Sequence, residues 1–509
     1  MSVICGIALR GTKALTVEVE VEITGGLFSI TVVGLPDTAV KEARERVRAA
    51  LRGIGVALKG RIAINLAPAD LPKEGALLDL PMAVGLAAAA GRVETKLKAI
   101  FMGELALDGR LRWVRGAVPA AMLAREMNVP LFVPRENETE VALIEGVEAY
   151  AVDNLLSLLL HLRGELSIPR VERRFPKNEV FEVETDFQDI KGQFAAKRAL
   201  EIAAAGHHNL LMTGSPGSGK TLLARAMRGI MPPLSDAEMM EVLVVRSTAG
   251  LQFEPGRTRP FRSVHHTASS VAICGGGASM RPGEVSLADR GVLFLDEFPE
   301  FSRDVLEALR EPLQDGTITV SRAAGSVTYP ANVLLVTACN PCPCGYLGDP
   351  AEQCRCSQGS LERYRRKLSG PILDRIDLHV SVPRLAPEEL VSLGDGGEPS
   401  AAVRERVERA RKIQQDRWGG MGYQCNAELP ERVLRHNLEM EDDVKTFLAD
   451  AMKRVRFSGR GYSRILKVAR TVADLEGAGR IAVRHVAESL SYREEMAFGN
   501  YGLRNGWKR

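Results

Sequence analysis

The first third of the chain alternates between short strand-like and helix-like patterns of apolar residues. Apolar positions at helical spacing predict helices over residues 37–51 and 78–90, and further strand and helix signals continue to about residue 162. Strand-like patterning predicts strands over residues 15–23, 27–33 and 61–66. The pattern as a whole predicts a compact α/β domain over residues 1–165.

The middle of the chain has a different pattern, in which apolar residues run continuously. Such runs predict strands over residues 209–212, 292–295 and 333–337. Continuous apolar runs are typical of parallel strands that are buried on both faces. We therefore expect a doubly wound α/β domain over residues 187–385. A charged segment interrupted by prolines, residues 166–186, predicts a linker in front of it.

The last part of the chain has the pattern of a helical domain. Apolar positions recur at helical spacing over residues 401–416 and 462–475. A glycine-rich stretch at residues 394–400 predicts a second linker before them. We expect a helical domain over residues 401–500.

Composition and charge narrow the class of protein only slightly. The chain has 509 residues, more than one hydrophobic core usually organises, and a formal charge of +3, so any nucleic-acid contact must come from local basic patches. No segment has the pattern of a secretory signal or of a membrane span. We expect a cytoplasmic protein without a membrane partner.

A phosphate-binding loop follows the first apolar strand of the middle domain. Residues 214–221 read GSPGSGKT and open a helical pattern. Glycines let backbone N–H groups converge on phosphates, the lysine neutralises charge, and the hydroxyl after it ligates magnesium. The motif predicts that ATP and Mg²⁺ are bound by Gly214, Ser215, Pro216, Gly217, Ser218, Gly219, Lys220 and Thr221.

Two carboxylates, Asp296 and Glu297, end the second apolar strand. This placement puts Asp296 beside the magnesium ion and Glu297 where it can polarise the attacking water, so the pair predicts ATP hydrolysis. Asp296 follows Lys220 by 76 positions (296 − 220), which is longer than a minimal nucleotide-binding core needs. We expect an insert between them, at residues 264–287.

Four of the eight cysteines lie within fifteen residues: Cys342, Cys344, Cys354 and Cys356. Two thiol pairs joined by a nine-residue loop can form a tetrahedral Cys₄ site for structural zinc. One-residue spacing within a pair is less usual than two, so free thiols and redox pairing are the alternatives. We expect His265 and His266 to lie in a loop and not to be ligands.

Further motifs resemble one family of ATPases. The sequences RPGE at 281–284, GVLFLDE at 291–297, NPCPCG at 340–345 and SGPILDRID at 369–377 are similar to those of the magnesium-chelatase-like AAA+ proteins, the YifB/ComM family. The resemblance extends from residue 2 to about residue 497. It implies a P-loop AAA+ domain with an insert in helix 2 and a hairpin before sensor 1, followed by a helical lid.

The same resemblance implies roles that spacing alone does not show. Asn340 is similar to sensor 1, which contacts the γ-phosphate or the attacking water. Arg375 is similar to the arginine finger, which reaches the nucleotide of a neighbouring subunit and so implies a ring, expected to be a homo-hexamer. Arg460 is similar to sensor 2, with Arg464 as the less favoured choice.

A hairpin is predicted between the acidic pair and Asn340. Residues 317–320 and 326–329 are β-rich and flank residues 322–325. In the family this hairpin projects into the central pore, so the resemblance implies that Arg322 contacts a translocated polymer. A solvated hairpin tip is the alternative.

The N-terminal domain resembles the ribosomal S5-type fold that the Lon protease domain shares. The resemblance rests on PKEG at 72–75 before a helix and on GELALDG at 103–109 as a strand. Leu77 stands where Lon has its nucleophilic serine, and Val118 or Ala120 where Lon has its lysine, so neither nucleophile nor base is present. We expect a domain that binds or organises and has no protease activity.

Three functions follow from these features. The ComM resemblance implies a helicase-like motor for branch migration of recombination intermediates in natural transformation, acting on branched or single-stranded DNA without sequence preference. The family name also suggests a metal-chelatase-like or protein-remodelling motor, although the chain lacks an Asp-x-Ser-x-Ser metal-adhesion motif, which would lie on a partner subunit. An ATP-dependent protease lacks its nucleophile at Leu77. We favour the DNA motor.

Overall fold

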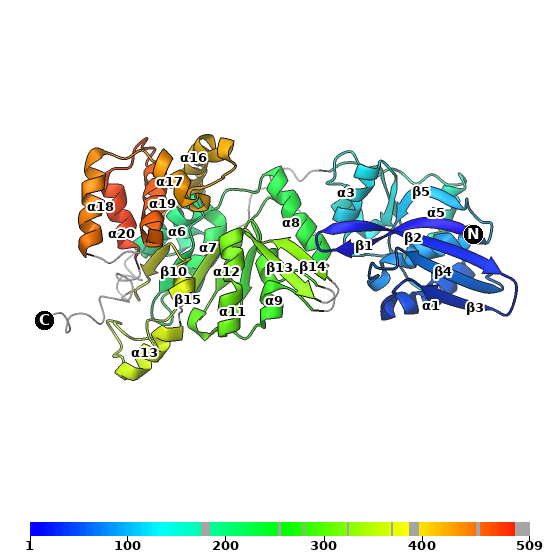
Figure 1. The fold of residues 1–509 in the computed structure, drawn as a ribbon, viewed down its shortest axis with the longest axis horizontal. Coiled ribbons are helices and arrows are strands. Elements are labelled where there is room, and N and C mark those ends of the chain that lie inside the picture. The colour runs from blue at the N-terminus through cyan, green and yellow to red at the C-terminus, as the bar shows by residue number, and fades with distance from the viewer. Residues whose placement is uncertain are drawn as a thin grey trace.

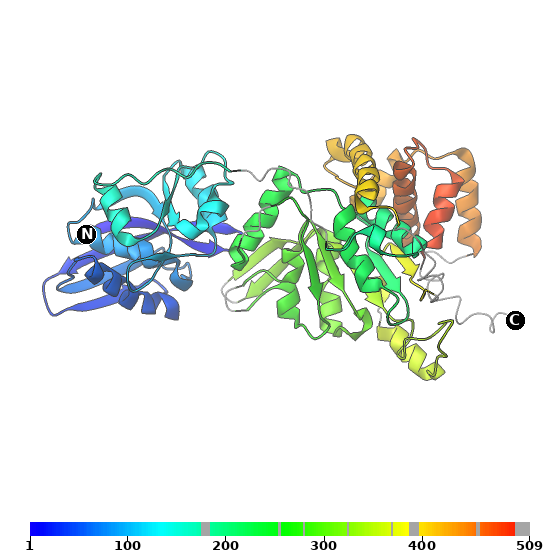
Figure 2. The ribbon, with the colours of Figure 1, turned by 180° about the vertical axis from the view of Figure 1, so that it is seen from behind.

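The computed structural model describes residues 1–174, 184–252, 256–277, 280–322, 325–367, 370–385, 397–454 and 459–493. An N-terminal α/β region, a central region around a parallel sheet and a set of C-terminal helices follow one another along the long axis (Figure 1). The view from behind shows the N-terminal strands and the C-terminal helices at opposite ends (Figure 2). No helix within these ranges is long and apolar enough to cross a bilayer.

The N-terminal region is built on a seven-stranded sheet with the strand order β3-β4-β2-β1-β5-β8-β9. Along β1, Ile4 and Ala8 join one buried core, whereas Ile7 joins a second core on the opposite face. Both faces of the sheet are therefore covered. The strands and helices are β1 (Ser2–Arg10), β2 (Lys13–Thr24), β3 (Ser29–Val33), α1 (Thr38–Gly53), β4 (Arg61–Ala67), η1 (Gly75–Leu78), α2 (Asp79–Ala89), β5 (Lys96–Phe101), β6 (Glu104–Leu105), β7 (Leu111–Arg112), α3 (Ala117–Met127), β8 (Leu131–Pro134), η2 (Arg135–Asn137), α4 (Glu138–Val141), β9 (Ala149–Val152) and α5 (Leu155–Leu162).

Two predictions for this region need correction. The strand predicted over residues 103–109 is wrong beyond Glu104–Leu105, because Gly109, with φ +86°, donates its N–H to Ala106 O and reverses the chain into β7. The start of the predicted linker packs on the domain, because Val171 N donates to Ala149 O at 2.8 Å and Ile168 is buried. Residues 175–183 of that linker lie outside the described residues.

The central region has a five-stranded parallel sheet with the order β11-β12-β15-β10-β16. Leu210 and Met212 of β10 face one core with α6 and α7, whereas Leu211 faces another. This alternation confirms the doubly wound fold. The elements are η3 (Phe187–Asp189), α6 (Phe194–Gly206), β10 (Leu210–Thr213), α7 (Lys220–Ile230), α8 (Asp236–Ala249), β11 (Phe261–Val264), α9 (Ser270–Cys274), α10 (Glu284–Leu287), β12 (Val292–Leu295), η4 (Phe298–Glu300), α11 (Arg303–Ala308), α12 (Arg310–Asp315), β13 (Thr317–Arg322), β14 (Gly325–Pro330), β15 (Leu334–Cys339), α13 (Gln358–Lys367), α14 (Gly370–Leu373) and β16 (Leu378–Ser381).

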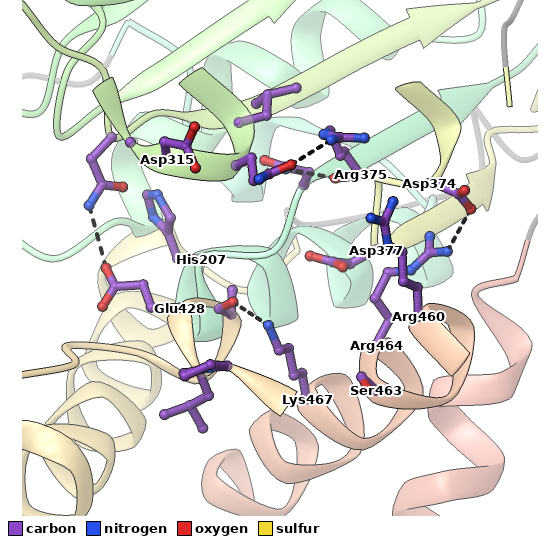
Figure 3. A pocket seen from close by; sticks show the side chains of 18 of the residues that line it. His207, Asp315, Asp374, Arg375, Asp377, Glu428, Arg460, Ser463, Arg464 and Lys467 are labelled. Atoms are coloured by element: carbon purple, nitrogen blue, oxygen red, sulfur yellow. Dashed lines mark hydrogen bonds and ion pairs between the residues drawn. The ribbon is translucent and has the colours of Figure 1, made fainter. Parts of the chain in front are cut away.

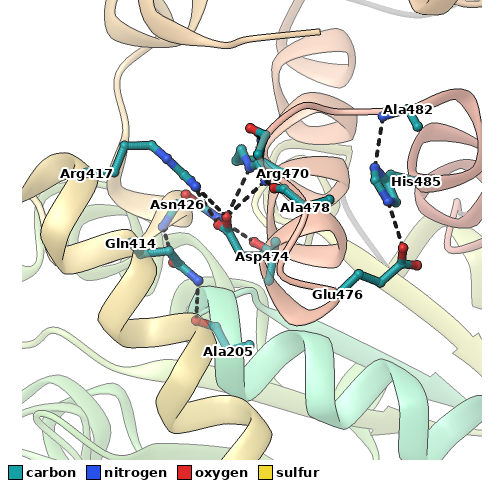
Figure 4. Close-up of polar contacts among 12 residues, drawn as sticks. Ala205, Gln414, Arg417, Asn426, Arg470, Asp474, Glu476, Ala478, Ala482 and His485 are labelled. Carbon is teal, nitrogen blue, oxygen red and sulfur yellow. Dashed lines mark hydrogen bonds and ion pairs between the residues drawn. The ribbon is translucent and has the colours of Figure 1, made fainter. Parts of the chain in front are cut away.

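The C-terminal helices share a buried polar network (Figure 4). Asp474 accepts hydrogen bonds from Arg417 Nη2 at 2.7 Å, Asn426 Nδ2 at 2.8 Å and Arg470 Nε at 3.1 Å, and its side chain is fully buried. The network ties α16, η6 and α19 together. The elements are α16 (Ser400–Trp418), η5 (Gly419–Met421), η6 (Asn426–Glu428), α17 (Glu431–Asn437), α18 (Asp442–Arg454), α19 (Gly459–Leu475) and α20 (Val483–Ser491).

Helix α8 joins the N-terminal region to the central one. Met239 and Leu243 of α8 belong to the same buried core as Val118 of α3. Ser247 O accepts from Gly116 N at 2.9 Å, and Ser247 Oγ donates to Glu140 at 3.2 Å. Apolar burial and buried hydrogen bonds therefore hold the two regions together.

Candidate nucleotide-binding site

The GSPGSGKT loop lies between β10 and α7, at the carboxyl end of a buried strand. Gly217 and Gly219 have φ of +76° and +93°, a backbone conformation that favours glycine. A Cβ on Gly214 would stand 2.2 Å from Val382 O, so glycine is required there as well. These glycines permit the tight turn that directs backbone N–H groups and the start of α7 toward a phosphate group.

Lys220 is held inside the loop. Its Nζ donates to Gly214 O at 2.7 Å, to Ser215 O at 3.0 Å and to Asn340 Oδ1 at 3.3 Å. Burial lowers the pKa of this ammonium group, and the carboxylates of Asp296 and Glu297 act in the opposite direction. The structure thus brings the lysine, the predicted sensor 1 residue and the acidic pair into one site.

Thr221 and Asp296 are positioned as a magnesium site requires. Thr221 Oγ1 donates to Asp296 Oδ2 at 2.9 Å, and Asp296 Oδ1 accepts from the backbone N–H of Glu297 at 2.9 Å. Glu297 itself has φ of +51°, which is uncommon for a residue with a side chain and is typical of functional sites. A hydroxyl and a carboxylate oxygen in contact fit the ligand preferences of Mg²⁺.

His266 is a neighbour of Glu297 that the sequence pattern does not reveal. His265 and His266 lie in the loop after β11, as expected, and neither joins the cysteines. His266 Nδ1 lies 3.0 Å from Glu297 Oε2, with side-chain exposures of 28% and 54%. The strand β11 pairs with β12, which explains how a residue 31 positions (297 − 266) before Glu297 reaches it.

The four cysteines of the 342–356 loop converge. The Sγ atom of Cys342 lies 3.4 Å from that of Cys344 and 3.7 Å from that of Cys354, and all four sulfur atoms, including Cys356, lie within 4.8 Å of one another. A tetrahedral metal with bonds of about 2.3 Å places its sulfur ligands about 3.8 Å apart. The observed spacing therefore fits four ligands of one zinc ion.

Backbone hydrogen bonds favour the thiolate form of one of these cysteines. Burial raises the pKa of Cys344, but hydrogen bonds from the backbone N–H groups of Tyr346 and Arg355, together with those from Cys342 and Cys356, lower it to about 6. A thiolate is the form that binds metal.

The cysteine loop packs directly on the phosphate-binding loop. A Cβ built on Gly345 would stand 2.6 Å from Pro216 Cδ, so only glycine fits this contact. Tyr364 of α13 donates its hydroxyl to Asn340 O at 3.0 Å. The cysteine loop therefore contacts the phosphate-binding loop, and the helix that follows the cysteine loop contacts Asn340.

Arg375 and Arg460 lie where the parallel strands of the central sheet begin, whereas the phosphate-binding loop lies where they end. That loop leaves the carboxyl end of β10, whereas Arg375 precedes the amino end of the parallel strand β16, and its carbonyl accepts from Asn209 Nδ2 at 2.8 Å. The strand β10 has four residues, so its amino and carboxyl ends are about 13 Å apart. Arg375 therefore lies away from the chain's own phosphate-binding loop, and Arg460 lines the same cleft as Arg375.

Both arginines line a cleft of about 650 Å³ between the central region and the C-terminal helices (Figure 3). Arg375 Nη2 donates to Gln314 Oε1 at 2.7 Å. Burial lowers the pKa of Arg375, and the nearby positive charges of Arg310 and Arg460 lower it further. The carboxylates of Asp374 and Asp315 act in the opposite direction on the pKa of Arg375.

Arg464 has a structural environment that separates it from Arg460. Its guanidinium donates to Ile376 O at 3.0 Å and to Asp374 Oδ1 at 3.1 Å. It therefore fixes the segment that carries Arg375 onto α19. Arg460 is exposed at the start of the same helix, and its assignment as sensor 2 stays a prediction.

Arg322 lies where the β13–β14 hairpin turns. The pairing of Thr317 with Pro330 through Arg322 with Gly325 confirms the predicted hairpin. The Arg322 side chain is exposed, and residues 323 and 324 lie outside the described residues.

The N-terminal region has an apolar cluster at the position of the Lon catalytic pair. Leu77 and Val118 are both buried and belong to the same core, together with Ala120.

A phosphate-binding loop, an acidic pair and an asparagine on one parallel sheet with this strand order define the chain as a P-loop protein of the AAA+ class. Family models support this along most of the chain. They are described as "Magnesium chelatase, subunit ChlI" at residues 186–390, "Subunit ChlI of Mg-chelatase" at residues 19–137, and "Magnesium chelatase, subunit ChlI C-terminal" at residues 397–493.

Similar proteins extend over almost the full length. The chain is 42% identical over 501 residues to "Competence protein ComM" of Haemophilus influenzae, covering 97% of each chain. It is 42% identical over 499 residues to YifB of Escherichia coli, covering 97% of each chain. A magnesium-chelatase 67 kDa subunit of Heliobacterium mobile is 27% identical over 257 residues, or 44% of this chain and 37% of the relative. The chain belongs to the magnesium-chelatase-like AAA+ family that includes ComM and YifB.

Proposed function

We propose that the protein is an ATP-hydrolysing ring motor, expected to be a homo-hexamer, that moves branched or single-stranded DNA. The observation that carries the proposal is the separation of Arg375 and Arg460 from the phosphate-binding loop. Each of these arginines can serve a nucleotide only across a subunit boundary, so a complete site requires head-to-tail assembly. Such assembly closes into a ring when the rotation between subunits allows it.

The chemistry within one subunit follows from the described contacts. Lys220 would exchange its bonds to loop carbonyls for bonds to phosphate oxygens. Thr221 and Asp296 would hold a magnesium ion, which would neutralise phosphate charge. Glu297 orients and polarises the attacking water, and Asn340 contacts that water or the γ-phosphate. Arg375 of the adjacent subunit stabilises the charge that develops in the transition state.

We infer two positions for the Glu297 side chain: one beside His266, and one in which it acts on the attacking water. The Oε2 atom of Glu297 lies 3.0 Å from His266 Nδ1, beside the loop after β11. The catalytic arrangement requires the carboxylate to turn toward water instead. We propose that His266 restrains Glu297 until a conformational change in the insert releases it.

We propose that Cys342, Cys344, Cys354 and Cys356 bind one structural zinc ion. The support is the convergence of four sulfur atoms at distances that suit tetrahedral coordination. Four protein ligands leave no position for chemistry, so the zinc would fix the loop that packs on Pro216.

The DNA substrate is supported by the relative whose printed name is a competence protein and by the exposed Arg322 on the hairpin. The deciding experiment measures ATP hydrolysis and strand movement with single-stranded, duplex and four-way-junction DNA. We expect stimulation by branched DNA that weakens as salt increases, because phosphate contacts release counterions. If the assembled, hydrolysing protein neither bound nor processed forked or four-way DNA at low salt, a chelatase-like or protein-remodelling motor would replace the proposal.

A further inference from the structure

The tip of the β1–β2 hairpin contacts the β13–β14 hairpin. A Cβ built on Gly11 would stand 2.3 Å from Val327 Cγ1, so the tip approaches as closely as a glycine allows. Arg10 Nη2 lies 3.0 Å from the position that a Cβ on Gly325 would occupy. The N-terminal region therefore brings a guanidinium group to the turn that carries Arg322.

The insert brings another guanidinium to the same place. Gly276 and Arg281 exchange backbone hydrogen bonds of 2.9 and 3.0 Å, and Arg322 Nη2 lies 3.7 Å from the position of a Cβ on Gly276. Tyr329 Oη donates to Met280 O at 2.7 Å and ties the insert to β14. Arg281 and Arg322 therefore sit on one connected unit of insert and hairpin.

These arginines carry positive charge that the described part of the chain does not neutralise. Arg10, Arg281 and Arg322 are exposed, and their side chains have no hydrogen bond or ion pair with any described residue. Arg10 and Arg281 also line a cleft of about 460 Å³ between the N-terminal and central regions. The carboxylates on its wall are Asp70 and Glu74, and Glu74 is already paired with Arg115 at 3.4 Å.

We propose that Arg10, Arg281 and Arg322 form one phosphate-binding site, the three-arginine cluster, which holds the backbone of a DNA strand between the N-terminal region and the β13–β14 hairpin. Guanidinium groups bind phosphate with paired hydrogen bonds, and these three, each from a separate chain segment, form no ion pair with a described carboxylate. The cluster rests on the proposed DNA function and extends it. It gives the protease-like region a role in gripping the strand that the hairpin moves.

The test measures binding of a fluorescein-labelled four-way junction to the full-length protein by anisotropy, with a slowly hydrolysed ATP analogue, over a series of salt concentrations. We expect Arg10→Ala and Arg281→Ala each to weaken binding by at least roughly fivefold at low salt. The slope of log affinity against log salt should fall by about 0.9 for each phosphate contact removed from duplex DNA. DNA-free ATP hydrolysis should not change, because neither side chain contacts the nucleotide site.

Two controls separate a defined site from general charge and from misfolding. Lys96→Ala removes an exposed positive charge at the far end of β1, where Lys96 pairs with Val3, and should leave affinity and salt slope unchanged. Arg10→Lys keeps the charge but loses the paired hydrogen bonds, so its affinity should lie between those of Arg10→Ala and the wild type.

The possible results distinguish this site from the proposed function. In one outcome the wild type binds DNA, and the double variant Arg10→Ala, Arg281→Ala binds it with the same affinity and the same salt slope. That result would overturn the proposal of a three-arginine cluster and leave the proposed DNA motor in place. Equal weakening by Lys96→Ala, or displacement of DNA by polyglutamate at lower concentrations than by unlabelled DNA, would also overturn the cluster. A wild type that binds no DNA would overturn both.

Discussion

The contact between the cysteine loop and the phosphate-binding loop gives a prediction that separates metal binding from nucleotide binding. Gly345→Ala leaves all four thiols in place, so the zinc content should stay at that of the wild type. A side chain at φ of +87° costs about 1–2 kcal/mol. The new Cβ also meets Pro216 Cδ at 2.6 Å, and relieving such overpacking against a rigid ring costs about 1–3 kcal/mol.

The second cost acts on the phosphate-binding loop, because Pro216 belongs to it. We assign about 1.4 kcal/mol of this cost to ATP binding, which corresponds to a factor of ten. The Kd for ATP should therefore rise by about tenfold, as measured by titration with a fluorescent ATP analogue. Gly422→Ala is the matched control, because Gly422 has φ of +85° and no heavy atom lies within 4 Å of the position that its Cβ would occupy. An unchanged ATP affinity in Gly345→Ala, with zinc retained, would refute the coupling between the two loops.

The remaining predictions concern the nucleotide site and the cysteines. Lys220→Ala should abolish ATP binding, whereas Glu297→Gln should retain it and release phosphate at least about 10²-fold more slowly, so fast turnover by the glutamine variant would remove Glu297 as the catalytic base. His266→Ala should raise DNA-free hydrolysis by up to about fivefold, the effect of a partly exposed pair worth about 1 kcal/mol, and a lower rate would contradict the restraint. Metal analysis should find about one zinc per chain, lost when Cys342 and Cys356 become serine, and a wild type without metal would exclude this site.

Much of the central region is predictable because its strands are apolar throughout. Residues 292–295 coincide with β12, all of whose residues are buried. The phosphate-binding loop and the acidic pair are equally predictable, since their chemistry requires fixed residue types next to strand ends. Strand β11 (Phe261–Val264) is absent from the predicted strands, because it lies at the sheet edge and includes Arg262 and Ser263.

The sequence pattern does not reveal contacts between segments that are far apart along the chain. His266 reaches Glu297 only because β11 pairs with β12, and Arg10 reaches the β13–β14 hairpin only because the N-terminal region docks through α8. The position of Arg375 and Arg460 at the edge away from Lys220 likewise depends on strand direction in the folded sheet. The convergence of four cysteines is predictable, because their spacing along the chain already allows one metal site.

The proposed assembly has its most direct test in mixtures of two inactive proteins. Arg375→Ala keeps its own catalytic site but lacks the group supplied to a neighbour, and Glu297→Gln has the opposite defect. In a head-to-tail ring, a random equal mixture has both intact halves at about a quarter of its interfaces. We predict that phosphate release recovers to as much as about a quarter of the wild-type rate when the two proteins are mixed. No recovery at any ratio, in mixtures shown to assemble together, would contradict a nucleotide site shared between subunits.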